Sequence, residues 1–101
     1  MNPKFQIEFY NDEAEKEYRK LDGSIKKLVN VGLKKLEERA DEIGKELHGP
    51  LFGCKELKYL KHGIRVIFRL VDGIVQVVEI IAIGARKDDE VFETAENRLK
   101  K

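Results

Sequence analysis

The stretch that decides the fold is CKELKYLKHGIRVIFRLVDGIVQVVEIIAI, residues 54 to 83. Apolar residues alternate with polar ones or run together between two turn signals, His62-Gly63 and Asp72-Gly73, the second of which is typical of β-hairpins. In the last segment both sets of alternating positions are apolar, as in a central strand covered on each face. The pattern predicts three strands, at residues 54–60, 64–71 and 74–83.

Upstream of this block the sequence predicts one strand and two helices. Residues 5 to 9 alternate apolar with polar side chains, which indicates a short half-buried strand. Asn11 or Asp12 can cap a first helix, which Asp22-Gly23 ends, and Ser24 can cap a second. The second helix is expected to extend to Leu47, because apolar residues recur at helical spacing at Ile25, Leu28, Val29, Leu33, Leu36, Ala40, Ile43 and Leu47.

The C-terminal segment has the charge order of a helix. Asp88, Asp89 and Glu90 come first and Arg98, Lys100 and Lys101 come last, which complements a helix dipole. The expected fold is therefore α+β in the order β-α-α-β-β-β-α, with a mainly antiparallel sheet. We expect the N-terminal helical hairpin to cover one face and the C-terminal helix to lie on the other face or at the edge. A length of 101 residues predicts one domain, residues 1–101.

Composition favours a soluble cytoplasmic protein. Charged residues make up 39% of the chain, and no apolar run approaches the roughly 18 residues that a membrane span needs. The N-terminus lacks the apolar segment of a signal peptide, and the single cysteine, Cys54, has no internal partner for a disulfide. No membrane association is therefore expected.

Positive charge is concentrated in the second half of the chain. The net charge is only +1, but residues 55–87 carry seven Lys or Arg against three Asp or Glu. A local excess matters for phosphate binding, because salt limits electrostatic reach to about 10 Å. The alternative is that these lysines and arginines form the solvated face of an edge strand.

Three motifs in this order resemble one protein family over essentially the whole chain. They are LHGPLFGCKELK at 47–58, GIRVIFR at 63–69 with its following Asp-Gly turn, and IGARKDDEVF at 83–92. Together they resemble the RelE/ParE superfamily of bacterial toxins from type II toxin–antitoxin systems. The resemblance implies a RelE-like fold and a cognate antitoxin that holds the toxin inactive. It also implies a higher-order complex that binds operator DNA through the antitoxin.

The RelE-like branch of this family cuts mRNA, usually in the ribosomal A site, by attack of the RNA's own 2′-hydroxyl and without a metal or other cofactor. The resemblance implies that Lys58 is the base or a phosphate contact and that Arg65 and Arg86 stabilise the transition state. Nearby arginines would lower the Lys58 pKa from its usual value of about 10.4. The structural alternatives are a solvated lysine at 58 and an ion pair of Arg65 with Glu56 or Glu79.

Other residues of the same region are secondary candidates. The expected RNA contacts are Lys55, Lys61, Arg69 and Phe92, although Arg69 can instead pair with an acid. The family pattern has a lysine where this chain has Glu56, and a tyrosine where it has Phe92. Glu56 is therefore a candidate base, and Arg86 or His62 a candidate acid; His48 is a weaker candidate, and no metal site is expected.

Three functions follow from the resemblance. The favoured one is a ribosome-dependent mRNA endonuclease that inhibits translation, with mRNA and the ribosomal A site as partners. The second is a ParE-like toxin that inhibits DNA gyrase without cutting, which Glu56 and Phe92 favour. The third is a degenerate member that acts mainly by binding an antitoxin, which the near-neutral net charge favours.

Overall fold

The protein is described here from a computed structural model, which covers residues 4–73, 75–85 and 89–100. The elements are β1 (Gln6–Phe9), α1 (Asp12–Arg19), α2 (Gly23–Arg39), β2 (Lys45–Glu46), β3 (Cys54–Tyr59), β4 (Ile64–Val71), β5 (Val77–Ala85) and α3 (Glu90–Leu99). Short 3₁₀ helices, η1 (Gly49–Leu51) and η2 (Leu60–His62), flank β3. The sheet has the order β1-β5-β4-β3-β2, and only the β1–β5 pair is parallel among the described strands. The α+β prediction is confirmed.

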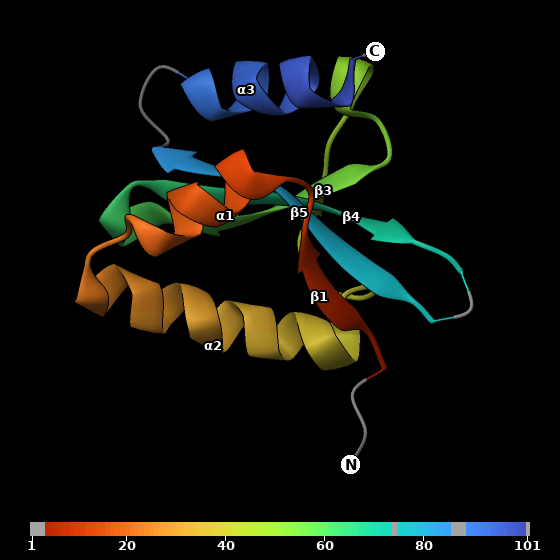
Figure 1. Ribbon diagram of the computed structural model, residues 1–101, viewed down its shortest axis with the longest axis horizontal. Helices are drawn as coiled ribbons and strands as arrows, with labels where there is room; N and C mark the ends of the chain where they lie inside the picture. The colour runs from red at the N-terminus through yellow and green to blue at the C-terminus, as the bar shows by residue number, and fades with distance from the viewer. Residues whose placement is uncertain (1–3, 74, 86–88, 101) are drawn as a thin grey trace.

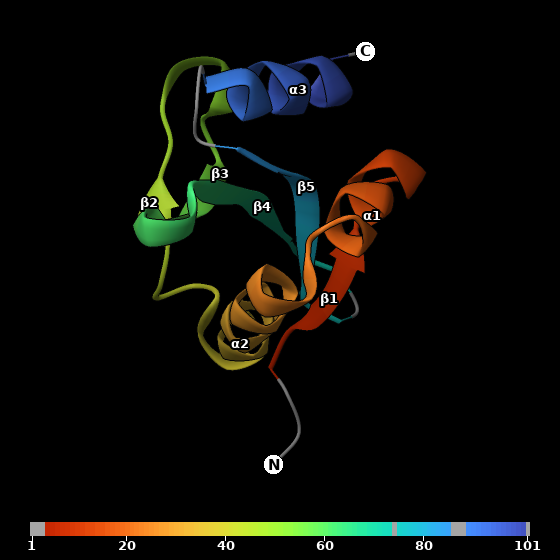
Figure 2. The ribbon, with the colours of Figure 1, turned by 90° about the vertical axis from the view of Figure 1, so that its left-hand side faces the viewer.

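The sheet lies between two helices. Figure 1 shows α3 on one side of the sheet and α2 on the other, as expected for the terminal helix. Figure 2, a view turned by 90°, shows α1 beside β1 and β5. The expectation that both helices of the hairpin cover one face is therefore only half right: α2 covers a face, and α1 lies along an edge. β1 pairs only with the first half of β5, from Val77 to Ile80, so the second half of that edge is open to α1.

The open edge of β5 is closed by side chains. The Ile83 amide donates to Glu17 Oε1 at 3.0 Å, and Arg98 Nη1 donates to the Ile81 carbonyl at 2.9 Å. Arg98 Nη2 also donates to Glu17 Oε2 at 2.7 Å. One ion pair between α1 and α3 thus supplies the donor and the acceptor that a neighbouring strand would otherwise provide.

The core has a layer on each face of the sheet. The layer toward α2 contains Phe5, Val29, Leu36, Ala40, Val66, Phe68, Val78, Ile80 and Ile83. The layer toward α3 contains Leu51, Cys54, Ile67, Ile81, Ala82, Val91 and Ala95. The prediction that β5 is covered on both faces is confirmed. In β4, Val66, Ile67 and Phe68 are all buried, because α3 covers the second face and the register shifts between Ile67 and Phe68.

The second helix is shorter than predicted. It ends at Arg39 rather than near Leu47, and Gly44 adopts a φ of +92° that an L side chain rarely takes. Ile43 then packs against the α2-side core, whereas Leu47 packs against the α3-side core. Their spacing fitted one helical stripe, but the two side chains lie on opposite faces of the sheet. The intervening residues pair with β3 as strand β2.

Several element ends also differ from the sequence prediction. Asn11 caps α1 as expected, whereas Asp22, not Ser24, caps α2 by accepting from the amides of Ser24 and Ile25. β3 ends one residue early, and β5 extends to Ala85; Ile74 and Asp88 lie outside the described residues. In the part of the chain that the structure describes, no helix combines the length and apolar character needed to cross a membrane.

Candidate functional site

The register of β3 and β4 brings two predicted site residues together. Lys58 lies directly opposite Arg65 across the antiparallel pair. Opposite residues of such a pair point to the same face, and in β3 this face also carries Glu56 and Cys54. Cys54 belongs to the core toward α3, so the two cations lie on the α3 side of the sheet. The third predicted member, Arg86, lies outside the described residues.

The Arg65 guanidinium is held by three neighbours. Its Nε lies 3.6 Å from Glu56 Oε2, and its Nη1 donates to Asp89 Oδ1 at 3.3 Å. Its Cζ lies 4.4 Å from the centroid of the Phe92 ring, a cation–π arrangement. The Arg65 side chain is only 12% exposed. The guanidinium therefore has a fixed orientation, which is the property that electrostatic stabilisation of a transition state requires.

Glu56 is the buried counter-ion of this cluster. It is 3% exposed, and it is the only buried charged residue within the described ranges. Its Oε1 lies 3.7 Å from the Lys58 ammonium, and its Oε2 faces Arg65. A buried carboxylate is tolerated when cations surround it, so Glu56 compensates the charges of Lys58 and Arg65.

Lys58 has a second lysine as its neighbour. The Lys45 ammonium beside it is the main cause that lowers the pKa of Lys58 below its ordinary value of 10.5. Partial desolvation and Arg65 act in the same direction, whereas Glu56 acts against them. The expectation of a lowered pKa from like charge agrees with this direction, but Lys45 was not among the predicted residues. Its position depends on the pairing of β2 with β3. The sequence pattern predicted a helix over these residues, so it did not indicate strand β2.

Two predicted RNA contacts lie outside the cluster. The Lys55 ammonium donates to the Ala40 carbonyl at 3.0 Å, just beyond the end of α2. Arg69 Nε donates to Glu79 Oε1 at 2.7 Å. Arg69 is therefore paired with an acid, which was the alternative to its predicted contact with RNA. Arg69 lies opposite Cys54, whereas Arg65 lies opposite Lys58, so the two arginines occupy opposite ends of the β3–β4 ladder.

The remaining candidates lie in short connecting elements. Lys61 and His62 belong to η2 and are exposed. His62 contributes a small part of the lowering of the pKa of Asp22, for which the hydrogen bond from Ser24 is the main cause. This places the imidazole toward the start of α2. His48 immediately precedes η1. Neither histidine contacts Lys58 or Arg65 in the ion pairs and hydrogen bonds of the described residues.

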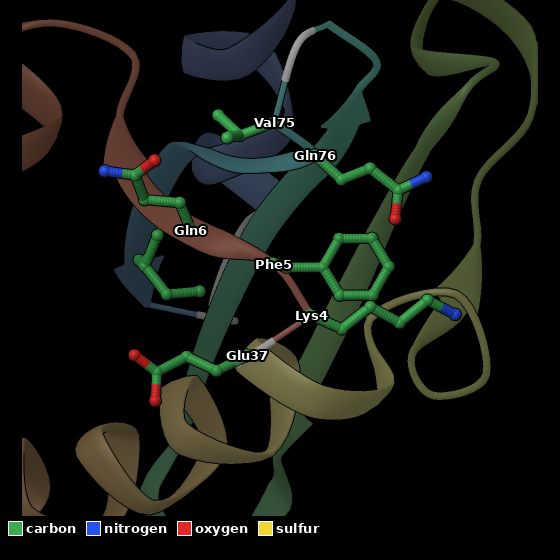
Figure 3. A pocket seen from close by; sticks show the side chains of 7 residues that line it. Lys4, Phe5, Gln6, Glu37, Val75 and Gln76 are labelled. Carbon is green, nitrogen blue, oxygen red and sulfur yellow. The ribbon is translucent and has the colours of Figure 1, made fainter. Parts of the chain in front are cut away.

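The most voluminous hollow described lies elsewhere. It measures about 650 Å³ and is bordered by the start of β1, the end of α2 and the β4–β5 connection (Figure 3). Lys4, one of its charged residues, is paired with Asp41 at 2.8 Å. None of the candidate catalytic residues that the structure describes lines this hollow. A smaller hollow of about 230 Å³ adjoins the site, because Phe92 lines it together with residues of η1.

The cluster has two of the chemical groups that phosphate chemistry needs, a candidate base and a cation for the phosphate oxygens. A lysine with a lowered pKa loses its own proton at lower pH than an ordinary lysine, and the neutral amine that results can accept a proton. A fixed guanidinium beside it can bind two phosphate oxygens as a fork. Phe92 contributes by holding this guanidinium, although its ring has no proton to transfer.

Comparisons with solved structures find close matches in fold. A free double-arginine-to-alanine mutant of the E. coli toxin RelE aligns with a TM-score of 0.79 and 26% identity, covering 95% of this chain and 98% of that one. The same mutant in complex with a peptide of antitoxin RelB aligns with a TM-score of 0.72 and 26% identity, covering 91% and 94% of the two chains. The RelBE2 toxin–antitoxin complex of Mycobacterium tuberculosis shares the fold, with a TM-score of 0.66 and 24% identity over 87% of this chain and 97% of that one. No protein-family model and no curated protein sequence matches the chain.

Proposed function

We propose that this chain, a RelE-like member of the RelE/ParE toxin superfamily of type II toxin–antitoxin systems, cuts mRNA on the ribosome and thereby inhibits translation. The observation that carries the proposal is the cross-strand pair of Lys58 and Arg65. The pair combines an ammonium whose pKa is lowered with a guanidinium in a fixed orientation.

In the proposed reaction Lys58 removes the proton from a ribose 2′-hydroxyl. The 2′-oxygen attacks the adjacent phosphorus, and the bond from phosphorus to the 5′-oxygen breaks, leaving a 2′,3′-cyclic phosphate and a 5′-hydroxyl. Arg65 stabilises the negative charge that grows on the phosphate oxygens. Arg86 is the proposed second arginine and the proposed donor of a proton to the leaving oxygen. Lys61, on the exposed η2, is a proposed contact with the RNA backbone.

A cognate antitoxin is the proposed protein partner. Similar toxins have been solved in complex with antitoxin RelB, including an intact E. coli RelBE complex that aligns at 26% identity. By analogy we propose that an antitoxin binds this chain and blocks its toxicity. Through the antitoxin, the complex would bind operator DNA.

The test is to induce the protein in growing bacteria and to follow the incorporation of labelled methionine and labelled thymidine in parallel. The proposal predicts that methionine incorporation stops first and that co-expression of the antitoxin restores it. Methionine incorporation that continues while growth stops would contradict the proposal.

One observation favours the gyrase-inhibiting alternative. Arg65 is already paired with two carboxylates, Glu56 and Asp89, which leaves less of its charge for RNA. That alternative predicts an early stop of thymidine incorporation and a DNA-damage response. A protein that acts only by binding its antitoxin predicts unchanged growth in the same experiment.

A further inference from the structure

Strand β2 is two residues long, and its first residue faces the cationic cluster. Lys45 lies directly opposite Glu56 in the antiparallel β2–β3 pair, so the two side chains point to the same face of the sheet. Lys58 lies two positions further along β3 and shares this face. Glu46, the other residue of β2, lies opposite Lys55 and points to the opposite face. The short strand thus delivers one exposed lysine to the site.

The charges around this lysine do not balance. Glu56 compensates Lys58 and Arg65, from 3.7 Å and 3.6 Å, and Asp89 adds a second carboxylate on Arg65. Within the described ranges, no carboxylate lies within 4.0 Å of the Lys45 ammonium. Among the described residues, the ammonium groups of Lys45 and Lys58 therefore have only the Glu56 carboxylate near them, and this carboxylate also pairs with Arg65. Neighbouring like charges favour the loss of a proton from one of them.

We propose that Lys45 is a positioning residue of this site: from strand β2 its positive charge acts on Lys58 and favours the loss of the Lys58 proton, which gives the neutral amine that can accept a proton from the substrate. The inference rests on the function proposed above, in which Lys58 is the base. Lys45 acts through Lys58 and needs no contact with the reacting atoms.

The charged groups that face Lys58 from each neighbouring element support this role. Lys45 on β2 is the largest influence that lowers the pKa of Lys58, and Arg65 on β4 is a smaller one. Glu56, on β3 itself, raises it, and Asp89 at the start of α3 is paired with Arg65. Without Lys45, the raising effect of Glu56 is opposed only by desolvation and by the smaller effect of Arg65, so the pKa of Lys58 should rise.

The direct test is a pH titration of the full chain labelled with ¹³C at lysine Cε, followed by NMR, with the Lys58 signal assigned from a Lys58→Arg variant. Lys45→Gln should move the Lys58 titration midpoint to higher pH, by up to about one pH unit for a like charge removed at the surface. Lys45→Arg keeps the charge and should leave the midpoint in place. Lys35→Gln, which removes an exposed lysine of α2, is the matched control and should also leave it in place. An unchanged midpoint in Lys45→Gln would overturn the inference.

A cleavage assay on ribosomes programmed with mRNA gives the second readout. Lys45→Gln should shift the acidic limb of the pH–rate profile upward by the same amount, so that the rate at neutral pH falls several-fold, up to about tenfold, and recovers at high pH. An equal loss at every pH would mean a merely structural role and would also overturn the inference. If the unsubstituted protein does not cleave, the proposed function fails, whereas the NMR titration still decides whether Lys45 controls Lys58.

Discussion

The carboxylate of Glu56 lies 3.6 Å from the guanidinium of Arg65, and the two facing atoms, Oε2 and Nε, are both buried without a hydrogen-bond partner in the described structure. The two residues are brought together by the β3–β4 ladder and covered by the start of α3. A buried ion pair is worth little as a source of stability, but removal of one member leaves the other uncompensated. The pair therefore makes the site sensitive to changes at either residue.

Glu56→Gln should destabilise the protein by about 1–3 kcal/mol, because Arg65 and Lys58 lose their shared counter-ion. The same change should lower the pKa of Lys58, since Glu56 raises it. Urea denaturation and the lysine titration measure the two effects. Glu38→Gln, at an exposed position of α2, is the control and should change stability by less than about 0.5 kcal/mol. Equal stability of Glu56→Gln and the parent would contradict the assignment of Glu56 as counter-ion.

Arg98→Met should destabilise the protein by about 1–3 kcal/mol, because it leaves the Ile81 carbonyl and Glu17 without their partner at the open edge of β5. In a domain of this size each kcal/mol lowers the Tm by about 4–8 °C. Thermal unfolding followed by circular dichroism measures the effect. Arg19→Met removes an exposed ion pair with Glu15 and should have little effect. Similar losses in the two variants would contradict the role of Arg98 in closing the sheet.

Gly32→Ala should destabilise the protein although alanine is the better helix former. A Cβ at this position of α2 would lie 2.1 Å from the Tyr59 hydroxyl oxygen, whereas the next atom, Leu57 Cδ1, is 3.2 Å away. The expected cost is about 1–3 kcal/mol for forced repacking. Tyr59→Phe removes the clashing oxygen, so the double variant should recover most of the loss relative to Tyr59→Phe alone. Failure of this recovery in urea denaturation would show that the close approach is not the cause.

The cap of α2 should make stability depend on pH in the acid range. The Ser24 hydroxyl is the main cause that lowers the pKa of Asp22 below its ordinary value of 3.8 in the folded state. The stabilisation is therefore complete above about pH 4 and is lost as the pH falls through the folded-state pKa. Asp22→Asn keeps a capping oxygen but cannot titrate. The Tm difference between parent and Asp22→Asn should be larger at about pH 6 than at about pH 2.5, and a constant difference would contradict the prediction.

The sequence predicted the fold through features that are local. β4 was predicted with its observed bounds, Ile64–Val71, because turn signals flank a continuous β-forming run. β5 was predicted to be central because both of its faces are apolar. The end of α2 was not predictable from spacing, since Ile43 and Leu47 satisfy a helical stripe and also the two faces of a sheet.

The site was predictable only in part. Strand alternation placed Glu56 and Lys58 on one face, and the pairing across the turn placed Arg65 beside them. The burial of Glu56 and Arg65 depends on how the start of α3 covers the sheet, which no local pattern encodes. The position of Lys45 depends on a two-residue strand that forms by pairing with β3 after the chain turns at Gly44.

Primer extension on a highly expressed transcript after induction is the sharpest test of whether Lys58 and Arg65 cut mRNA. Arg65→Lys is the variant of choice at this position, because it keeps a positive charge beside the buried Glu56 but loses the guanidinium fork. New 5′ ends within the coding region are expected for the parent and for Lys35→Gln. Lys58→Met and Arg65→Lys should lower the yield of these ends by about 10²-fold or more, with both variants still folded. Intact transcripts in cells arrested by the parent, or unchanged new ends in both variants, would contradict cleavage by Lys58 and Arg65.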